Sequence, residues 1–518
     1  MAYHKKKLFK QIRKLFMQLE EATIAELQEA MTSGQITARR LTELYIERMQ
    51  QLDRQGPRLR SVLEINPDAL TIADELDRER QSKGIRGSLH GIPILLKENI
   101  ATDDRMETTA GSLALLGSRV PRDAFVARRL REAGAVILGK ANLSEWANFR
   151  STSSSSGWSG RGGQTRNPYI LDRSPCGSSS GSAVAVSANL AAASLGTETD
   201  GSILCPSSIN GVVGIKPTVG LTSRAGVIPI AHSQDTVGPF GRTVADAAAV
   251  LGALTGVDAL DAATLASEGK FHTDYTQFLD ADGLRGARIG VAREVYFGYS
   301  SKTDAIINAA IEKMKELGAE VIDPANVPTA KQMSDSEAEL TVLLFEFKAD
   351  LNQYLAELVS SPVRTLEEVI AFNRAHAEQE MPYFAQELHE KAQATTTLED
   401  PKYLAALEEN HRLAREEGID AVMDQFHLDA LVMPTNGPSW CIDLINGDLV
   451  SGGSSQPAAL AGYPAISVPA GFARDLLPVG ITFMGRAFSE PTLIKLAYAF
   501  EQATRVRRLP EFLTTMSF

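Results

Sequence analysis

Two short turns rich in glycine and serine, Cys176–Ser182 and Thr197–Ile203, hold the residues of this sequence best suited to chemistry. Turns of this composition expose backbone N–H groups and bring hydroxyl oxygens close to a ligand. The run between them, Ala183–Leu195, consists almost wholly of small residues and predicts a helix against which neighbouring backbones pack closely. Two flexible linkers around a core helix are the alternative. We disfavour it because linkers do not alternate with a buried helix and a Cys-Pro turn.

A lysine at the end of an apolar run is the second chemical feature. Gly91–Asn99 predicts a short buried strand that delivers Lys97 and the amide of Asn99. A buried ammonium is costly, so Lys97 is expected to be desolvated or paired. The alternative is a lysine at a strand end that extends to water, and this stretch alone does not decide between the two.

These two features together favour a serine hydrolase with an unusual base. A serine nucleophile needs a base, which is most often histidine. No histidine lies in or next to the two turns, the nearest downstream is His232, and there is no GxSxG elbow with a following Asp and His. A neutral lysine can take the place of the histidine, and Lys97 is the candidate.

The elements around these turns alternate between helices and strands, which predicts an α/β fold. We expect a helix over Asp123–Ala133, capped by Asp123, and a strand over Ala135–Leu138. Residues 330–424 read as a largely helical insertion that could form one wall of a substrate cleft. We expect four segments, which we take as parts of one large domain: an N-terminal helical segment (1–80), a core with the candidate catalytic residues (81–260), an α/β continuation with the helical insertion (261–430) and the C-terminal part of the core (431–518).

Composition and charge set limits on partners. The chain has 518 residues, of which 44% are hydrophobic and 22% charged, as in an ordinary soluble globular protein. A net charge of -12 makes a nucleic-acid backbone an unsuitable main partner. Met1–Leu19 predicts a basic amphipathic helix packed on the body rather than a signal peptide. No segment is apolar enough for a transmembrane helix, and we expect a cytoplasmic protein.

Cysteine and histidine give no sign of a metal or a disulfide framework. The three cysteines, Cys176, Cys205 and Cys441, are too few and too scattered for such a framework. We expect Cys176 and Cys205 to act as small packing residues. The eight histidines show no metal-ligand spacing, so no metal is expected.

The motifs together resemble the amidase signature family. The resemblance rests on Gly91–Asn99, the GSSSGS turn at Gly177–Ser182, GTETDGSILCP at Gly196–Pro206 and GVVGIKPT at Gly211–Thr218. It continues through SQDTVGP at Ser233–Pro239 and QPAALAGYPAISVPAG at Gln456–Gly471, so it covers nearly the whole chain. Within the family, the RSPCGSSSGS and GTETDGSI spellings are most similar to those of bacterial peptide amidases.

The resemblance implies a fold and a catalytic site. The fold would be a mixed central β-sheet covered by helices on both faces. The site would be a Ser–cisSer–Lys triad, with Ser202 as nucleophile, Ser178 as the bridging serine after a cis Gly177–Ser178 bond, and Lys97 as base. Ser179 would be a supporting hydroxyl near the lysine, and the backbone N–H groups of Thr199, Asp200, Gly201 and Ser202 would form the oxyanion hole. No cofactor or metal is implied.

Two positions depart from the common family spelling GGSIR. Asp200 replaces a glycine and Leu204 replaces the arginine, and both positions border the site. If the Asp200 carboxylate faces the site, it would repel a free carboxylate and tolerate a neutral carboxamide. The alternative is that Asp200 only caps its own turn.

The favoured function is hydrolysis of the C-terminal carboxamide of peptides through an acyl-enzyme. A hydrolase of other small or fatty amides is a second hypothesis. A third is the amidase component of a tRNA amidotransferase, which the helical insertion and the TETDGSIL spelling disfavour. A catalytically silent scaffold is disfavoured because all three chemical groups are present. We expect a monomer or homodimer.

Overall fold

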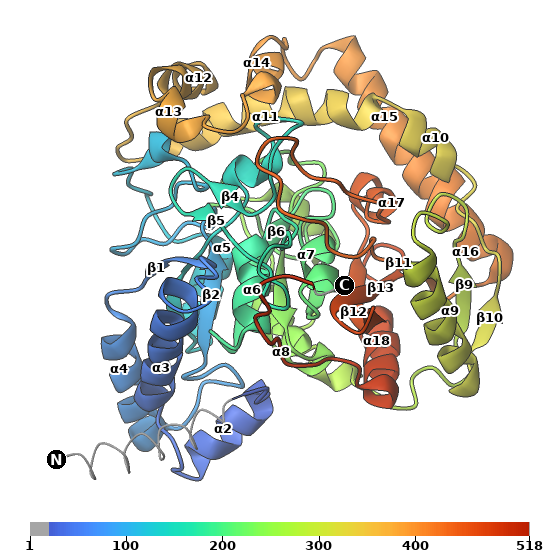
Figure 1. Ribbon diagram of the computed structural model, residues 1–518, viewed down its shortest axis with the longest axis horizontal. Helices are drawn as coiled ribbons and strands as arrows, with labels where there is room; N and C mark the ends of the chain where they lie inside the picture. The colour runs from blue at the N-terminus through green and yellow to red at the C-terminus, as the bar shows by residue number, and fades with distance from the viewer. Residues whose placement is uncertain (1–19, 517–518) are drawn as a thin grey trace.

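A mixed β-sheet runs through the middle of the molecule (Figure 1). The computed structural model describes residues 20–516, and within this range eleven strands form the sheet in the order β1-β3-β2-β6-β8-β7-β12-β13-β11-β9-β10. A separate small hairpin consists of β4 and β5. The strands are β1 (Val62–Ile65), β2 (Pro93–Lys97), β3 (Val136–Ala141), β4 (Trp158–Ser159), β5 (Gly163–Gln164), β6 (Ala193–Glu198), β7 (Val213–Lys216), β8 (Thr236–Gly241), β9 (Arg288–Val291), β10 (Glu320–Ile322), β11 (Ala430–Pro434), β12 (Ala465–Ala473) and β13 (Leu477–Met484).

The middle of the sheet is antiparallel and joins distant parts of the chain. Strand β2 pairs in parallel with β3 and β6, and β9 pairs in parallel with β10 and β11. Between these parallel parts, β12 pairs antiparallel with β7, which joins the first half of the chain to its C-terminal part. The pairing is continuous, so both halves of the chain contribute to a single sheet.

Helices cover both faces of this sheet, as the family resemblance implied. Seven of them, α10–α16, form the predicted helical insertion, which Figure 1 shows in yellow and orange along the top and right of the sheet. The helices are α2 (Ile24–Thr32), α3 (Ala38–Arg48), α4 (Ala69–Lys83), α5 (Phe125–Glu132), α6 (Ser180–Ser187), α7 (Leu204–Ile209), α8 (Val244–Leu254), α9 (Ser301–Glu316), α10 (Ala330–Asp335), α11 (Ala338–Glu357), α12 (Leu366–Ala375), α13 (Ala377–Glu380), α14 (Glu387–Gln393), α15 (Pro401–Ala414), α16 (Asp420–Phe426), α17 (Gln456–Ala461) and α18 (Glu490–Thr504).

The run of small residues between the two turns is not a single helix, and that prediction was wrong. Helix α6 ends at Ser187, and β6 begins at Ala193 as a central strand between β2 and β8. Asn189 lies between them with a φ of 56°, a left-handed conformation that ends the helix. Small apolar residues fit a buried helix and a buried strand equally well, so the pattern alone did not separate them.

Two further expectations differ from the structure, and a third is not tested by it. The cap of α5 is Ala124, while the Asp123 carboxylate binds the Arg131 guanidinium and accepts the backbone N–H of Asp103. The N-terminal segment is not wholly helical, because it contributes β1 to the edge of the sheet. The predicted helix over Met1–Leu19 lies outside the described residues. No described helix has both the length and the apolar character needed to cross a bilayer.

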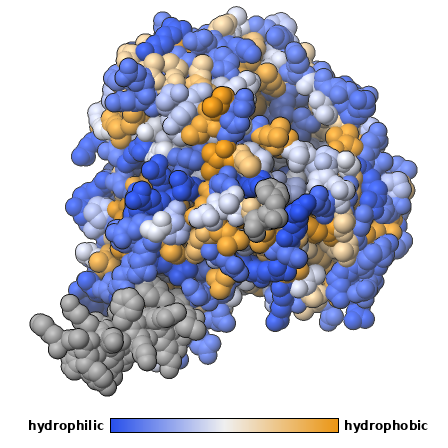
Figure 2. All heavy atoms as spheres, viewed as in Figure 1, coloured by the Kyte–Doolittle hydropathy of each residue, from blue (hydrophilic) through white to orange (hydrophobic). Residues whose placement is uncertain are grey.

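The surface in the view of Figure 1 is mostly hydrophilic, with hydrophobic residues gathered toward its middle (Figure 2). Among the described large hydrophobic side chains, Ile445 and Leu449 are the most exposed, at 88% and 79%. Both lie on the long connection between β11 and α17, so part of this connection contributes apolar surface, while its Trp440 is buried.

We predict that the close approach of α6 to the sheet tolerates no side chain at Gly181. A Cβ atom there would lie 2.2 Å from the Ser61 carbonyl oxygen and 2.5 Å from the Asn142 carbonyl oxygen. Gly181→Ala should therefore lower the free energy of unfolding by about 1–3 kcal/mol or more, the cost of overpacking a tight site. Gly87→Ala is the matched control, because a Cβ there meets no atom within 4 Å. Equal melting temperatures for the two variants would contradict the prediction.

Candidate active site

Lys97 is the buried end of the candidate site. It is the last residue of β2, and its Nζ donates to the Ser178 Oγ at 2.7 Å and to the Thr197 Oγ1 at 2.8 Å. The side chain is fully buried, so the alternative of a lysine that extends to water is excluded. Burial lowers the pKa of Lys97 to about 7, although the negative charges of Asp235 and Glu198 act in the opposite direction. A substantial fraction of this amine is therefore neutral near pH 7.

The position of Lys97 follows from its strand. Ile94, Leu95 and Leu96 are fully buried in a strand that lies between two parallel neighbours. This pairing fixes where β2 ends, and the carboxyl ends of β2 and β6 lie at the same edge of the sheet. The amine and the turn that follows β6 are therefore held together by the sheet itself.

The two glycine and serine turns meet at this edge. The Ser179 backbone N–H donates to the Ser202 carbonyl oxygen at 3.2 Å, which brings the two turns into contact. The Gly177–Ser178 peptide bond is cis, as the family resemblance implied. Ser178 is fully buried, whereas Ser202 is 8% exposed. Ser202 is therefore the more accessible serine of this pair, and Ser178 contacts the lysine.

The turn at Thr197–Ile203 presents unused N–H groups. Gly201 has a φ of 77°, and the backbone N–H groups of Asp200, Gly201 and Ser202 find no acceptor among residues 20–516. The next two N–H groups, of Ile203 and Leu204, both donate to the Glu198 Oε2, at 2.6 and 2.9 Å. Glu198 thus holds the turn from its inner side while the free N–H groups can bind an anionic oxygen.

Ser179 lies near the lysine, as expected, but its contacts are to the backbone. Its Oγ donates to the Thr197 carbonyl oxygen at 3.0 Å and accepts the Thr197 N–H at 3.2 Å. The Lys97 Nζ also lies 3.3 Å from that carbonyl oxygen. Ser179 therefore fixes the strand end against the helix that follows Ser178.

Sequence reasoning missed two residues that position the site. Thr197 shares its hydroxyl between Lys97 and the Asn99 side-chain amide, which donates to it at 3.0 Å. Asp235 accepts the Thr199 hydroxyl at 2.5 Å and the backbone N–H groups of Ile230 and Ala231. Burial raises the pKa of Asp235 to about 6, against these hydrogen bonds. The SQDTVGP motif contains Asp235, and an aspartate directly before a buried strand was the signal that could have found it.

Cys176 and Cys205 form a disulfide, so the expectation that they are only packing residues was wrong. Their Cα atoms are 6.1 Å apart although 29 residues separate them in sequence. The reversal of the chain between α6 and β6 brings the two turns together, and the spacing in sequence could not show this. Cys441 is the remaining cysteine and is exposed.

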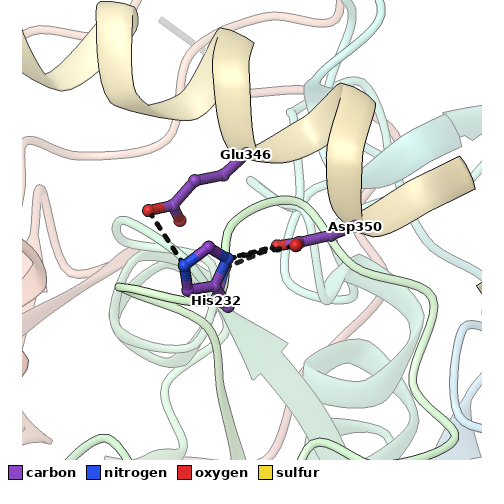
Figure 3. Close-up of side chains that lie close together, drawn as sticks. All are labelled: His232, Glu346 and Asp350. Carbon is purple, nitrogen blue, oxygen red and sulfur yellow. Dashed lines mark hydrogen bonds and ion pairs between the residues drawn. The ribbon is translucent and has the colours of Figure 1, made fainter. Parts of the chain in front are cut away.

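The helical insertion is fastened to the site through His232. Figure 3 shows its ring between two carboxylates of α11, with Nδ1 2.9 Å from an Asp350 oxygen and Nε2 3.4 Å from a Glu346 oxygen. Burial alone would lower the pKa of His232, but the Asp350 hydrogen bond and the two negative charges raise it. These three side chains offer metal-type ligand atoms within 4.8 Å of one another. Because both ring nitrogens are engaged by carboxylates, the cluster acts as an ion-paired fastening.

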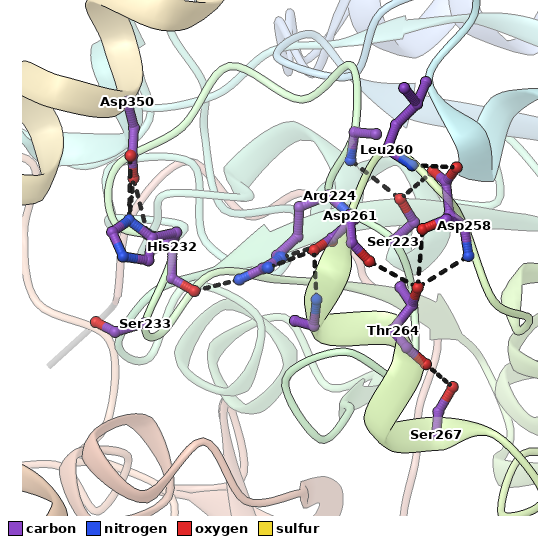
Figure 4. A network of polar contacts seen from close by, with 12 residues as sticks. Ser223, Arg224, His232, Ser233, Asp258, Leu260, Asp261, Thr264, Ser267 and Asp350 are labelled. Atoms are coloured by element: carbon purple, nitrogen blue, oxygen red, sulfur yellow. Dashed lines mark hydrogen bonds and ion pairs between the residues drawn. The ribbon is translucent and has the colours of Figure 1, made fainter.

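The segment that carries His232 is also anchored to the body of the fold. The Arg224 guanidinium pairs with Asp261 and donates to the His232 carbonyl oxygen, as Figure 4 shows. Ser223 donates to Asp258 at 2.7 Å in the adjoining network. The segment that carries His232 and Asp235 is thus fixed between α11 and the body, and it holds Thr199 in place.

Asp200 does not cap its own turn. Among the described residues its carboxyl group accepts no backbone N–H, and its Oδ1 has no hydrogen-bond partner. Burial and the negative charge of Asp200 raise the pKa of Glu339 in α11, which places the carboxyl group toward the insertion. The structure therefore argues against the alternative that Asp200 only caps its turn.

The arrangement as a whole can move a proton away from a hydroxyl and stabilise an oxyanion. A buried amine contacts one serine, and a second, more accessible serine lies on the adjoining turn. Free N–H groups surround the accessible serine. Acyl transfer needs these three components.

Comparisons with known proteins point to one family. A family model described as Amidase matches residues 40–494. The native peptide amidase from Stenotrophomonas maltophilia superposes with a TM-score of 0.91 at 54% identity, covering 95% of this chain and 99% of that chain. A probable amidase of Arabidopsis thaliana is 48% identical over 502 residues, 96% of this chain and 92% of its own length. A glutamyl-tRNA(Gln) amidotransferase component from a Cyanothece species is 35% identical over 507 residues, 93% of this chain and 98% of its own length.

The disulfide predicts the number of thiols that can be alkylated. The chain unfolded without a reductant should take up one alkylating group, on Cys441, and the chain unfolded after reduction should take up three. Mass spectrometry of the intact protein and of its tryptic peptides measures both numbers. Three groups without reduction would show that Cys176 and Cys205 are thiols in the native protein.

Proposed function

This chain belongs to the amidase family, and we propose that it is a serine amidohydrolase whose catalytic residues are Ser202, Ser178 and Lys97. Family membership supports hydrolysis of an amide C–N bond. The observation that carries the assignment of residues is the fully buried Lys97 amine, 2.7 Å from the Ser178 Oγ. A lysine in this setting can accept a proton near neutral pH, and no other base in the described site contacts Ser178.

In the proposed reaction these groups act one after another. Neutral Lys97 takes a proton from Ser178, which takes one from Ser202, and the Ser202 Oγ attacks the amide carbon. The backbone N–H groups of Thr199, Asp200, Gly201 and Ser202 bind the oxyanion, and each such donor is worth roughly 3–4 kcal/mol. The proton returns to the leaving nitrogen, ammonia departs, and water cleaves the acyl-enzyme.

The proposed substrate is the C-terminal carboxamide of a short peptide. The likeness to the Stenotrophomonas maltophilia peptide amidase over 95% of this chain supports this choice. A second candidate is release of ammonia for a tRNA amidotransferase, which the 35% identity to the Cyanothece amidotransferase component supports. Hydrolysis of other small or fatty amides is a third. Hydrolysis of a peptide amide needs no partner chain, whereas ammonia release for an amidotransferase needs one. A monomer or homodimer therefore stays our expectation.

A cytoplasmic location stays a prediction. The Cys176–Cys205 disulfide argues against this location, because structural disulfides persist mainly in oxidising compartments.

Covalent labelling tests the nucleophile. A fluorophosphonate should label Ser202, and Ser202→Ala should abolish both labelling and turnover. Ser178→Ala should lose several powers of ten in turnover without becoming the labelled site, because the residues act as a unit. Peptide mapping that finds the label on Ser178, Ser179 or another residue would overturn the assignment.

Ammonia release from a panel of amides tests the substrate. The panel holds short peptide amides, glutamine and a long-chain fatty amide, and we expect turnover of the peptide amides. Mass spectrometry should show only the exchange of the terminal NH₂ for OH, with internal peptide bonds intact. Glutaminase activity that depends on a co-purifying partner chain would favour the amidotransferase instead. Turnover of the fatty amide alone would favour the third candidate.

A further inference from the structure

Two carboxyl groups meet beside the nucleophile. Asp200 lies two residues before Ser202, and Glu339 lies in the first turn of α11. Both residues are half-buried. The Gln234 side-chain amide lies 3.1 Å from the Glu339 Oε1 and 3.4 Å from the carbonyl oxygen of Thr199, the residue before Asp200, so Glu339 lies against the turn that carries Asp200. Two carboxylates can hydrogen-bond to each other only when they share a proton.

The surroundings of Glu339 hold both of its carboxyl oxygens. Its Oε1 accepts the Gln234 side-chain amide at 3.1 Å, and its Oε2 accepts the Gln456 side-chain amide at 2.9 Å. Gln234 precedes β8, and Gln456 begins α17, so two separate parts of the chain hold this one side chain. Glu339 is therefore fixed in place, and its orientation toward Asp200 is built into the fold.

Asp200 needs the proton that Glu339 can supply. The Asp200 Oδ1 is buried and has no N–H or O–H donor among residues 20–516. A buried carboxylate oxygen without a donor is costly. A proton on Glu339 would supply such a donor.

The charges around the pair are consistent with one proton at neutral pH. Burial and the charge of Asp200 raise the pKa of Glu339 to about 8. Burial also raises the pKa of Asp200, while the neighbouring Ser455 and Glu339 side chains act in the opposite direction. The groups that face the pair are Glu198, Lys216, Tyr296, Gln234, Ser455 and Gln456.

We propose that Asp200 and Glu339 form a one-proton carboxyl pair that selects the substrate. The pair accepts N–H groups at the carboxamide end of the substrate, and its single negative charge rejects a carboxylate in the same place. A carboxamide carries N–H donors and no charge, whereas the product acid carries a charge and no donor. The pair thus favours substrate over product at Ser202. Asp200 is the specificity-determining residue, and Glu339 is a positioning residue. This inference rests on the proposed amide hydrolysis at Ser202.

Binding to an inactive protein tests the pair without turnover. In Ser202→Ala protein, calorimetry measures the Kd of an N-acetylated dipeptide amide and of the corresponding acid. We expect the amide to bind more tightly than the acid. Adding Asp200→Asn should reduce this preference by about tenfold to a hundredfold, the worth of one hydrogen bond to a charged group. Adding Glu339→Gln should weaken binding of the amide without tightening binding of the acid. The negative charge stays on Asp200, but the Asp200 carboxyl group is no longer held in place.

The matched control is Glu337→Gln, which removes the same charge from an exposed position directly before α11. It should leave the preference unchanged. The infrared absorbance of protonated carboxyl groups at neutral pH should fall by the share of one group in both pair variants and stay unchanged in the control. A preference that is unchanged by Asp200→Asn, or a wild-type site that binds acid as well as amide, would overturn the inference. Absence of ammonia release from peptide amides by the wild type would instead refute the proposed substrate.

Discussion

The burial of one amine is the constraint on which the site depends. An ammonium excluded from water is costly unless it is paired or gives up its proton, and Lys97 is fully buried with only hydroxyl and carbonyl oxygens within hydrogen-bonding distance. Its neighbours supply oxygens and no direct carboxylate, so burial dominates and its pKa falls to about 7. A carboxylate in contact would restore the charged form and remove the base. Asp235 and Glu198 act on Lys97 only through their charge.

The rest of the site follows from the need to bring a reachable hydroxyl to that amine. Strand β2 carries the lysine, and β6 beside it leads into the turn with Ser202. Helix α6 packs close to the sheet, and the Cys176–Cys205 disulfide links its turn to that of Ser202. The insertion adds selectivity rather than chemistry, because α11 supplies Glu339 beside the nucleophile and is fastened through His232.

Local residues could predict the chemistry, but contacts across the fold could not be predicted. Lys97 after an apolar run and hydroxyls in glycine turns are local patterns, and the family resemblance gave them their order. The prediction of one helix from Ala183 to Leu195 was wrong, because small apolar residues suit a helix and a strand alike. The disulfide and the Glu339 contact depend on segments 29 and 139 residues apart, which only the fold brings together. Asp235 could have been noticed within its motif. Its hydrogen bond to Thr199 could not have been predicted, because it joins residues 36 positions apart.

The most direct test of the account is the pH dependence of Ser202 phosphonylation, which needs no knowledge of the substrate. The Lys97 base form increases as pH rises through about 7, so the labelling rate should rise across that pH and level off above it. In Lys97→Met the rate should fall by several powers of ten and lose this titration. A titration near neutral pH that survives in Lys97→Met would contradict the account, because another group would then be the base.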